Sequence, residues 1–258
     1  MSEDSFTEVT HTSYGGRIKA SFKGIIFGLV FFVGAFPLLF WNEGRAVKRY
    51  QTLKEGEGAV VSVSPDRVEP GNQGRLVHTM GIADTPETLN DTVFGVSRAA
   101  IHLKRTVEMY QWKENRQTRT EKKTSGGEKK VTTYSYAKVW SSSLIDSSAF
   151  KRRSGHENPS SVPFETQTIT ASRVTLGAFV LSPALVREID NWSPLSIDGS
   201  KPVPTALGPH GTASDGGYFR GRDPQDPAIG DLNISFSEVP PGPVSLIAAQ
   251  QGKSFSAY

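Results

Sequence analysis

Residues that could carry out acid–base, nucleophilic or metal chemistry are few in this sequence and lie far apart. Its five histidines are His11, His78, His102, His156 and His210. No two of them have the i, i+4 spacing that places two ligands on one face of a helical metal site. The sequence also contains no G-x-S-x-G nucleophile elbow, no phosphate loop, no dinucleotide-binding motif and no cysteine. We therefore predict no catalytic residues, no metal site and no cofactor.

Two polar clusters leave weaker possibilities open. Asp223, Asp226 and Asp231 lie in a segment rich in proline and glycine and could bind calcium weakly. They lack the spacing of a calcium-binding loop, which favours aspartates that form turns. His156 beside Glu157 could supply a catalytic base, although adjacent residues of one loop more often cap a turn. A membrane-bound sensor or hydrolase is therefore the alternative function for this chain.

The element that dominates the sequence is an apolar segment, 24–41, which reads GIIFGLVFFVGAFPLLFW without a charged residue. As a helix rising about 1.5 Å per residue it extends for about 27 Å, close to the roughly 30 Å hydrocarbon core of a bilayer. A cleaved signal peptide has a shorter apolar core and a small-residue cleavage site, and a soluble core helix is rarely apolar on every face. We therefore expect an uncleaved transmembrane helix, whose spanning residues include Gly24, Gly28, Phe32, Pro37 and Trp41.

The apolar segment divides the chain into four parts. Residues 1–23 form a short polar tail, 24–41 the transmembrane helix, 42–56 an amphipathic stalk and 57–258 a domain long enough to bury a core. Basic residues flank both ends of the apolar segment almost equally, so the positive-inside rule does not set the orientation. The net charge of +3 is small for a chain of 28.1 kDa and gives no reason to expect a nucleic-acid partner.

The helix also carries residues that could support self-association. Ala20, Gly24 and Gly28 repeat at a spacing of four, and a Gly-x-x-x-Gly pattern permits close helix–helix approach, although an accidental glycine pair is as common. Glu43 stands at the membrane edge with no opposite charge at i+3 or i+4. Arg45 of a neighbouring chain could pair with it, and a solvated carboxylate is the alternative.

Residues 57–258 have the patterning of a β-rich domain. Apolar runs and apolar–polar alternation predict four short strands, at 59–63, 75–80, 232–236 and 244–248. Two short helices are expected, at 96–100 and at 183–191, where proline in the first turn is tolerated.

The clearest β feature is a long hairpin. Residues 103–112 and 131–140 both alternate, and a charged run between them contains Gly126-Gly127 as the predicted turn. The charged run is either a solvated tip or a partner-binding element, and the aromatic face is either a buried sheet face or an exposed contact surface. The aromatic residues of this candidate interaction hairpin are Trp112, Tyr134, Tyr136 and Trp140.

Six segments, in the same order along most of the chain, together resemble the LUMA family of membrane proteins of the eukaryotic nuclear envelope and endoplasmic reticulum, which has bacterial relatives. The segments are Asn42–Ala46, Glu69–His78, Val107–Trp112, Tyr134–Tyr136, Gly155–Ser160, and Gly230–Leu232 followed by Ser235–Ser237.

This resemblance implies one N-terminal membrane helix, a large extracytosolic domain and further membrane helices near the C-terminus. Eukaryotic members act as scaffolds that oligomerise and help retain emerin- and lamin-linked complexes, with no established enzymatic activity. This sequence stops at Tyr258 without the C-terminal helices, so we expect a truncated or short member. The absence of cysteine fits a bacterial member, to which emerin and lamins do not apply.

The combined prediction is an N-terminal transmembrane helix plus a mainly-β (β-rich α+β) extracytosolic domain with a long β-hairpin. Its predicted function is that of a membrane-anchored scaffold that self-associates and assembles membrane protein complexes without catalysis. The predicted partners are the lipid bilayer, further copies of the chain and other membrane proteins, with no nucleic acid. The predicted location is the bacterial inner membrane with a periplasmic domain, or the endoplasmic reticulum and inner nuclear membrane with a lumenal domain in a eukaryote.

Overall fold

The computed structural model describes residues 5–12, 14–122, 128–199, 202–214 and 216–256. The chain divides into two compact units. The first consists of Met1–Glu55, Trp112–Lys138 and Asp146–Glu157, and the second of Gly56–Gln111, Val139–Ile145 and Asn158–Tyr258. Two long strands, β6 (His102–Lys122) and β7 (Glu128–Ser141), contribute residues to both units.

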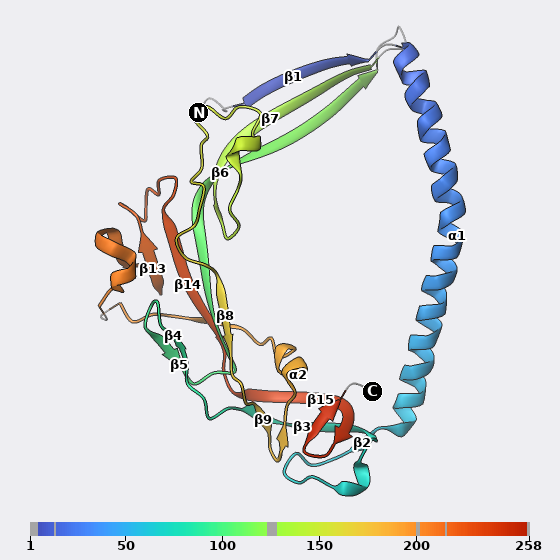
Figure 1. Ribbon diagram of the computed structural model, residues 1–258, viewed down its shortest axis with the longest axis vertical. Helices are drawn as coiled ribbons and strands as arrows, with labels where there is room; N and C mark the ends of the chain where they lie inside the picture. Colours follow the sequence, from blue (N-terminus) through green and yellow to red (C-terminus); the bar gives the residue numbers. More distant parts are fainter. Residues whose placement is uncertain (1–4, 13, 123–127, 200–201, 215, 257–258) are drawn as a thin grey trace. The chain divides into compact units, whose positions relative to one another are not determined.

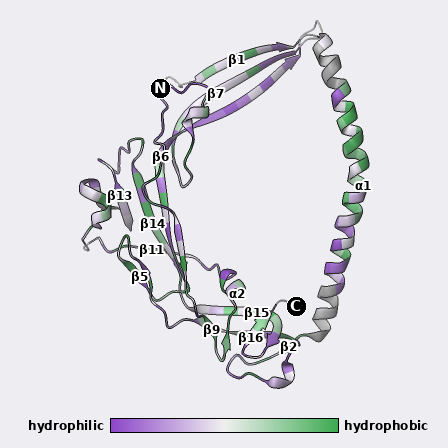
Figure 2. Cartoon of the chain, viewed as in Figure 1, coloured by the Kyte–Doolittle hydropathy of each residue, from purple (hydrophilic) through white to green (hydrophobic). Residues whose placement is uncertain are grey.

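The first unit contains one long helix, α1 (Tyr14–Ala59), with Pro37 inside it. Its segment Phe22–Gln51 is long and apolar enough to cross a membrane, and none of its most apolar window is buried. Figure 2 shows the hydrophobic residues gathered along part of α1, with hydrophilic residues following towards its C-terminal end. This exposure contradicts a soluble core helix. The helix also continues through the segment expected to be a stalk and ends three residues after Gly56.

A strand precedes this helix, in the part of the sequence expected to be a polar tail. Strand β1 (Ser5–Thr12) pairs antiparallel with β7, from Ser5 opposite Ser135 to Thr12 opposite Glu128. Figure 1 shows β1 lying along β7, whose other edge is hydrogen-bonded to β6. Phenylalanine, valine and threonine, which β1 contains, fit the pleated surface of a sheet.

The second unit is built from antiparallel sheets, in which β2 with β3 is the one parallel pair among the described strands. In the first sheet the order is β6-β14-β13-β12, with β11 on β14 and β8 on β6. Its further strands are β8 (Gln167–Thr170), β11 (Ser193–Leu195), β12 (Gly211–Ser214), β13 (Gly217–Arg220) and β14 (Leu232–Val239).

A second sheet of this unit has the order β10-β9-β3-β15-β16, with β2 on β3. Its strands are β2 (Val61–Ser62), β3 (Leu76–Asp84), β9 (Thr175–Leu176), β10 (Phe179–Val180), β15 (Gly242–Gln251) and β16 (Ser254–Ser256). Strands β4 (Leu89–Asp91) and β5 (Val96–Arg98) form a separate hairpin. The short helices are α2 (Pro183–Arg187) and the 3₁₀ turns Pro70–Asn72, Ser147–Ala149 and Thr205–His210.

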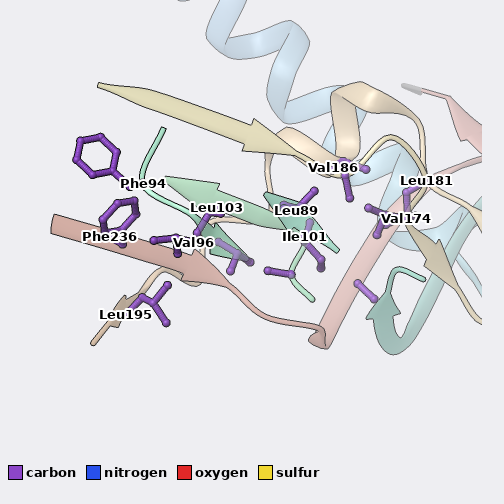
Figure 3. Close-up of a cluster of buried hydrophobic side chains, with 14 of the residues drawn as sticks. Leu89, Phe94, Val96, Ile101, Leu103, Val174, Leu181, Val186, Leu195 and Phe236 are labelled. Atoms are coloured by element: carbon purple, nitrogen blue, oxygen red, sulfur yellow. The ribbon is translucent and has the colours of Figure 1, made fainter. Parts of the chain in front are cut away.

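The core of the second unit collects side chains from one face of β6 and from the segments around it. Leu103, Val107 and Met109 of β6 are all buried, at alternate positions. Figure 3 shows Phe94, Val96, Leu103 and Phe236 among the labelled side chains of this cluster. The rings of Phe94 and Phe236 lie 5.9 Å apart in an edge-to-face arrangement. The fold is therefore an apolar N-terminal helix followed by a mainly-β domain, as predicted.

Comparison with the predicted elements gives one clear error. The helix expected at 96–100 is wrong, because Val96–Arg98 forms β5 and pairs with β4. The helix expected at 183–191 ends at Arg187, and the strand expected at 59–63 shrinks to Val61–Ser62. The strands expected at 75–80, 232–236 and 244–248 and both arms of the hairpin are confirmed, each longer than predicted. The turn expected at Gly126-Gly127 lies outside the described residues.

Candidate functional site

The central aromatic residue of the hairpin, Tyr136, is buried in a cluster with residues from the loop that follows β7. Its ring stacks on that of His156, with centroids 3.9 Å apart and planes at 22°. Trp112 meets the same imidazole edge-on, at 4.7 Å and 81°. His156 is only 1% exposed. The loop 146–157 is therefore held against the hairpin by a cluster of three rings.

Hydrogen bonds close this cluster around the Tyr136 hydroxyl. The hydroxyl donates to Glu114 Oε2 at 2.8 Å and accepts from the backbone N–H of Arg152 at 2.8 Å. The same Glu114 oxygen accepts from the backbone N–H of Lys151 at 2.6 Å. Burial, followed by the hydrogen bond to Glu114, raises the pKa of Tyr136. The phenol is therefore kept neutral and serves as a structural donor.

His156 and Glu157 each form a hydrogen bond with the backbone of their own loop. His156 Nδ1 lies 3.0 Å from the carbonyl oxygen of Arg152, so this nitrogen must carry the proton and donate it. Glu157 Oε2 accepts from the backbone N–H of Gly155 at 3.0 Å, which folds the carboxylate back onto its own turn. Gly155 has a φ of 83°, a left-handed conformation that glycine adopts readily. Both polar side chains thus shape the loop.

Tyr134, the other buried tyrosine of the hairpin, is surrounded by β1 and by basic side chains. The ring of Phe6 lies 6.3 Å from it, and Arg116 Cζ and Lys151 Nζ lie 5.9 and 6.0 Å from its centroid. Lys151 Nζ also lies 3.0 Å from Glu8 Oε2, and this contact raises the pKa of Lys151 through a hydrogen bond and the opposite charge. These contacts tie the loop to β1.

The four aromatic residues predicted for the hairpin each have contacts within their own unit. Trp112 packs on His156, and the Lys138 ammonium lies 5.3 Å from the Trp112 ring. Trp140 belongs to the second unit, where its ring lies 5.0 Å from Tyr110 and 6.3 Å from Phe219. Tyr134 and Tyr136 are each 8% exposed. Burial in the sheet, rather than an exposed aromatic contact surface, describes the two tyrosines.

The residues predicted for helix association lie on an open helix surface. A Cβ added at Gly24 or Gly28 would meet nothing within 4 Å, so both positions leave room for close approach. Phe32 meets Phe36 edge-on, at 5.2 Å. The side chain of Ala20 lies outside the described part of the structure.

At the end of the spanning segment the arginine has a contact within its own chain. Arg45 Cζ lies 5.5 Å from the ring of Trp41, one helical turn earlier. Glu43 lies between these two residues in the sequence and is exposed. The cation–π contact therefore competes with the predicted contact between Arg45 and Glu43 of a neighbouring chain.

Four of the other polar residues singled out in the sequence have hydrogen-bond partners in the second unit. His78 Nε2 lies 3.0 Å from Ser245 Oγ, and His102 Nε2 lies 2.9 Å from the Val186 carbonyl. Asp223 and Asp231 accept backbone N–H groups at 2.9 and 2.8 Å, as turn-forming aspartates do. Within the described ranges, no group of three or more potential ligands could hold a metal ion.

One open groove lies in the second unit, with a volume of about 500 Å³. The charged and ionisable side chains lining it are His210, Arg220, Arg222 and Asp231. The Asp231 carboxylate is committed to the backbone N–H of Ala228, and Arg220 Cζ lies 5.8 Å from the ring of Phe164. Asp231 and Arg220 are therefore held by contacts within the fold.

Sequence reasoning missed the polar residues that hold the hairpin cluster together. Glu114 stands inside the charged run, and Lys151 and Glu8 lie in segments treated as loop and tail. The signal that could have found Glu114 is its even position in the alternation of β6, which it shares with Tyr110 and Trp112. No local pattern marks Glu8 as a partner for Lys151.

Comparison of the sequence with known proteins identifies a family to which the chain is similar. Residues 109–258 match the family model described as Transmembrane protein 43. The rat protein named Transmembrane protein 43 is 38% identical over 255 residues, which cover 94% of this chain and 62% of the rat protein. The human protein of that name is 38% identical over 249 residues, covering 92% of this chain and 60% of the human protein.

A more distant relative extends the same match to insects. The Drosophila melanogaster protein named Transmembrane protein 43 homolog is 31% identical over 247 residues, covering 95% of this chain and 62% of the fly protein. No solved structure matches the chain. The chain thus spans about three fifths of the length of the curated relatives it matches.

Proposed function

The chain belongs to the transmembrane protein 43 (LUMA) family, and we propose that it is a non-catalytic membrane scaffold that self-associates and assembles other membrane proteins. The observation that carries this proposal is the exposed apolar segment Phe22–Gln51 of α1. Exposed apolar surface of this extent needs lipid or protein to cover it. A bilayer-spanning α1 provides the anchor, and the β-rich domain provides the surface on which complexes assemble.

The candidate site supports assembly rather than chemistry. The buried His156 and Tyr136 are engaged in a ring stack and in hydrogen bonds with the loop 146–157. We infer that the domain after α1 faces away from the cytosol, into the periplasm of a bacterium or into the lumen of the endoplasmic reticulum and nuclear envelope in a eukaryote, and the family resemblance supports this orientation. The partners of this proposed scaffold are lipid, further copies of this chain and other membrane proteins.

Cysteine labelling tests the anchor and its orientation together, because the natural chain contains no cysteine. Thr10→Cys and Ser160→Cys both replace exposed residues, one before and one after α1. If α1 spans the bilayer, a membrane-impermeant maleimide added from the extracytosolic side labels the Ser160→Cys variant in intact cells or vesicles. The Thr10→Cys variant should then be labelled only after permeabilisation. Labelling of both variants from the same side contradicts the spanning helix, and the reversed pattern contradicts the orientation.

Measurement of mass tests the scaffold. The full chain in nanodiscs or mild detergent, at micromolar concentration, is expected to contain more than one copy per particle. Mass spectrometry or light scattering gives the number of copies. A strictly monomeric species at that concentration contradicts the proposed self-association. Recovery of the intact N-terminal peptide from carbonate-washed membranes checks that the apolar segment is retained rather than cleaved.

A further inference from the structure

The outer edge of β7 is able to accept a further strand, because β1 occupies it in the structure. The pairing runs from Ser5 opposite Ser135 to Thr12 opposite Glu128. A side-chain contact reinforces the ladder, since Glu8 of β1 lies 3.0 Å from Lys151 in the loop 146–157. The edge therefore has the hydrogen-bonding groups, the extended conformation and the side-chain surroundings that strand addition needs.

A bilayer-spanning α1 excludes this pairing. Strand β1 ends at Thr12 and α1 begins at Tyr14, so a crossing helix leaves β1 on one side of the membrane and the described segments that follow Ala59, as far as β7, on the other. Among the residues that the structure describes, Phe22–Gln51 is the one helix long and apolar enough to cross. The described chain between Ala59 and β7 therefore has no segment to bring it back. The β1–β7 ladder and a spanning α1 are alternative states of this chain.

Membrane insertion consequently uncovers the edge of β7. A row of unpaired backbone N–H and C=O groups is a template for pairing with another extended segment. Copies inserted in the same orientation carry their own β1 in the opposite compartment, so β1 of a neighbour does not reach this edge. The same edge of β7 in a neighbour, by contrast, lies in the same compartment.

Symmetry limits how two copies of β7 can pair. Two identical antiparallel edges are related by a two-fold axis normal to the sheet, and this axis keeps each face on its own side. Residues that face each other must therefore both have even numbers or both have odd numbers. The axis then passes between the two copies of one residue. The register can then be chosen from the charges along β7.

An axis at Thr133 gives complementary charges at both ends of the ladder. It places Glu128 opposite Lys138 of the second copy, twice by symmetry, and Thr133 opposite itself. Moving the axis by one residue, to Tyr134, places Lys130 opposite Lys138 of the second copy, and like charges directly opposite destabilise a sheet. The register centred on Thr133 avoids this repulsion and pairs Thr132 with Tyr134 of the second copy.

We propose that, in the membrane-inserted chain, the β7 edge vacated by β1 binds the β7 edge of a second copy, antiparallel and centred on Thr133. This inference rests on the proposed function, because it names the surface through which the scaffold self-associates. The β1–β7 ladder shields the edge before insertion, and insertion of α1 releases it. Dimerisation thereby follows membrane integration.

Single cysteines in the otherwise cysteine-free full chain test the register in membranes of cells that express it. Thr133→Cys should form a cross-linked dimer with a short thiol-to-thiol reagent, which spans both kinds of antiparallel residue pair. Ala137→Cys is the matched control, since it lies on the same face of the same strand. In the proposed register the two copies of position 137 lie roughly 27 Å apart and should not cross-link.

A double variant separates the two states of the edge. Thr7 lies opposite Thr133 in the β1–β7 ladder. Thr7→Cys with Thr133→Cys should therefore give an intrachain cross-link in chain that has not been inserted, and an interchain dimer linked through position 133 in membranes. An intrachain cross-link in chain shown by maleimide labelling to be inserted overturns the exclusion between the two states.

Charge exchange tests the register without cysteine geometry. On the Thr133→Cys background, Lys138→Glu places like charges opposite each other twice and should lower the dimer yield roughly tenfold. Adding Glu128→Lys should restore it. Failure of the restoration, equal cross-linking at Ala137→Cys, or an adduct to a different protein in place of the dimer overturns the β7–β7 contact.

The mass measurement distinguishes this failure from failure of the proposed function. Oligomers that persist in nanodiscs while Thr133→Cys gives no cross-link show that the chain self-associates through another surface, which overturns the inference and leaves the scaffold standing. A monomer at micromolar concentration overturns both.

Discussion

The two halves of strand β6 bury their side chains very differently. From His102 to Gln111 alternate side chains are buried, including Leu103, Val107 and Met109. Beyond Trp112 the side chains of the same strand are exposed or only partly buried. The first half pairs with β14 and β8 within the second unit, whereas the second half belongs to the first unit. Packing in the hydrophobic core therefore stabilises the first half of β6, and local side-chain contacts stabilise the second half.

The buried polar groups near the two halves of β6 also differ in their interactions. In the first half, Arg105 and Asp91 form a buried ion pair, with side chains 5% and 2% exposed. Arg105 also donates to the Glu165 carbonyl at 3.0 Å. Beside the second half, the buried polar groups are the Tyr136 hydroxyl of β7 and the His156 ring of the loop 146–157, and both are held by hydrogen bonds. Removing one member of the buried ion pair should therefore lower the free energy of unfolding more than removing one of these hydrogen-bonded groups.

The largest expected effect is that of Asp91→Ala. Asp91 accepts from Arg105 and from the backbone N–H groups of Val93 and Phe94, the latter two at 3.1 and 3.0 Å. Its removal leaves a buried guanidinium without its counter-charge, which should lower the free energy of unfolding by about 3–5 kcal/mol. Urea unfolding of the full chain in mild detergent, followed by tryptophan fluorescence, measures this loss. Asp226→Ala, at an exposed position, is the control and should change stability by less than about 0.5 kcal/mol.

A smaller loss of stability is expected for His156→Ala, in the loop 146–157 that packs beside the second half of β6. The substitution removes a buried ring between Tyr136 and Trp112 and the hydrogen bond to Arg152. It should lower the free energy of unfolding by about 2–3 kcal/mol. The same change at the exposed His210 should be nearly neutral. Near-ultraviolet circular dichroism should also lose part of its aromatic signal. A His156→Ala variant as stable as the natural chain would show that the ring stack does not hold the loop.

The contrast between the halves also explains which parts were predictable from the sequence. The alternation of Leu103, Val107 and Met109 has the period of a strand and needs no knowledge of the partner strand. The ladder between Ser5–Thr12 and β7 joins segments far apart in the sequence, and nothing local in a short threonine-rich segment names its partner. The segment 96–100 looked helical in isolation, but pairing with β4 decided its conformation.

The candidate site was predictable to a similar, partial extent. Tyr134, Tyr136 and Trp112 were found because aromatic residues at alternate positions stand out in a strand. Glu114 was missed because it lies in a charged run, where most side chains are solvated, and only the pairing of β6 with β7 brings it to the Tyr136 hydroxyl. Tertiary contacts, rather than local composition, made the difference.

A third variant tests the hydrogen bonds of the Tyr136 hydroxyl, and a tyrosine of the second unit serves as the comparison. Tyr136→Phe removes the hydroxyl between Glu114 and Arg152. It should lower the free energy of unfolding by about 1–2 kcal/mol near neutral pH. The pKa of Tyr136 is raised above its ordinary value of 10.0, chiefly by burial and next by the Glu114 hydrogen bond. The stability that the neutral phenol contributes is therefore fully present below pH 10.0 and is lost as the pH rises through the folded-state pKa.

The stability curves of the natural chain and Tyr136→Phe should accordingly converge above that pH. Burial also raises the pKa of Tyr218, so Tyr136→Phe should keep the part of the alkaline loss that belongs to Tyr218. Tyr218→Phe should show the complementary behaviour. Urea midpoints measured at several alkaline pH values give both curves. Parallel curves for the natural chain and Tyr136→Phe would contradict a raised pKa at Tyr136.

The smallest expected effect on folding, and one confined to association, is that of Gly28→Leu in α1. A Cβ at this position meets nothing within 4 Å, so the substitution should leave the unfolding of the β-rich domain unchanged within about 0.5 kcal/mol. If helices of neighbouring copies approach along Gly24 and Gly28, the leucine holds the backbones apart. The lost contact, roughly 1 kcal/mol in lipid, corresponds to about fivefold weaker association.

Gly34→Leu provides the matched control, because a Cβ there also meets nothing within 4 Å and the substitution adds the same apolar volume to α1. Position 34 follows Gly28 by six residues and so lies on a different face of the helix. Energy transfer between labelled chains in vesicles, measured over a dilution series of lipid, gives both association constants. Equal weakening by the two variants would contradict a specific contact along Gly24 and Gly28. Weakening by Gly28→Leu alone would show that the glycine face of α1 contributes to self-association in addition to the proposed β7 contact, since insertion both brings the helices side by side and uncovers β7.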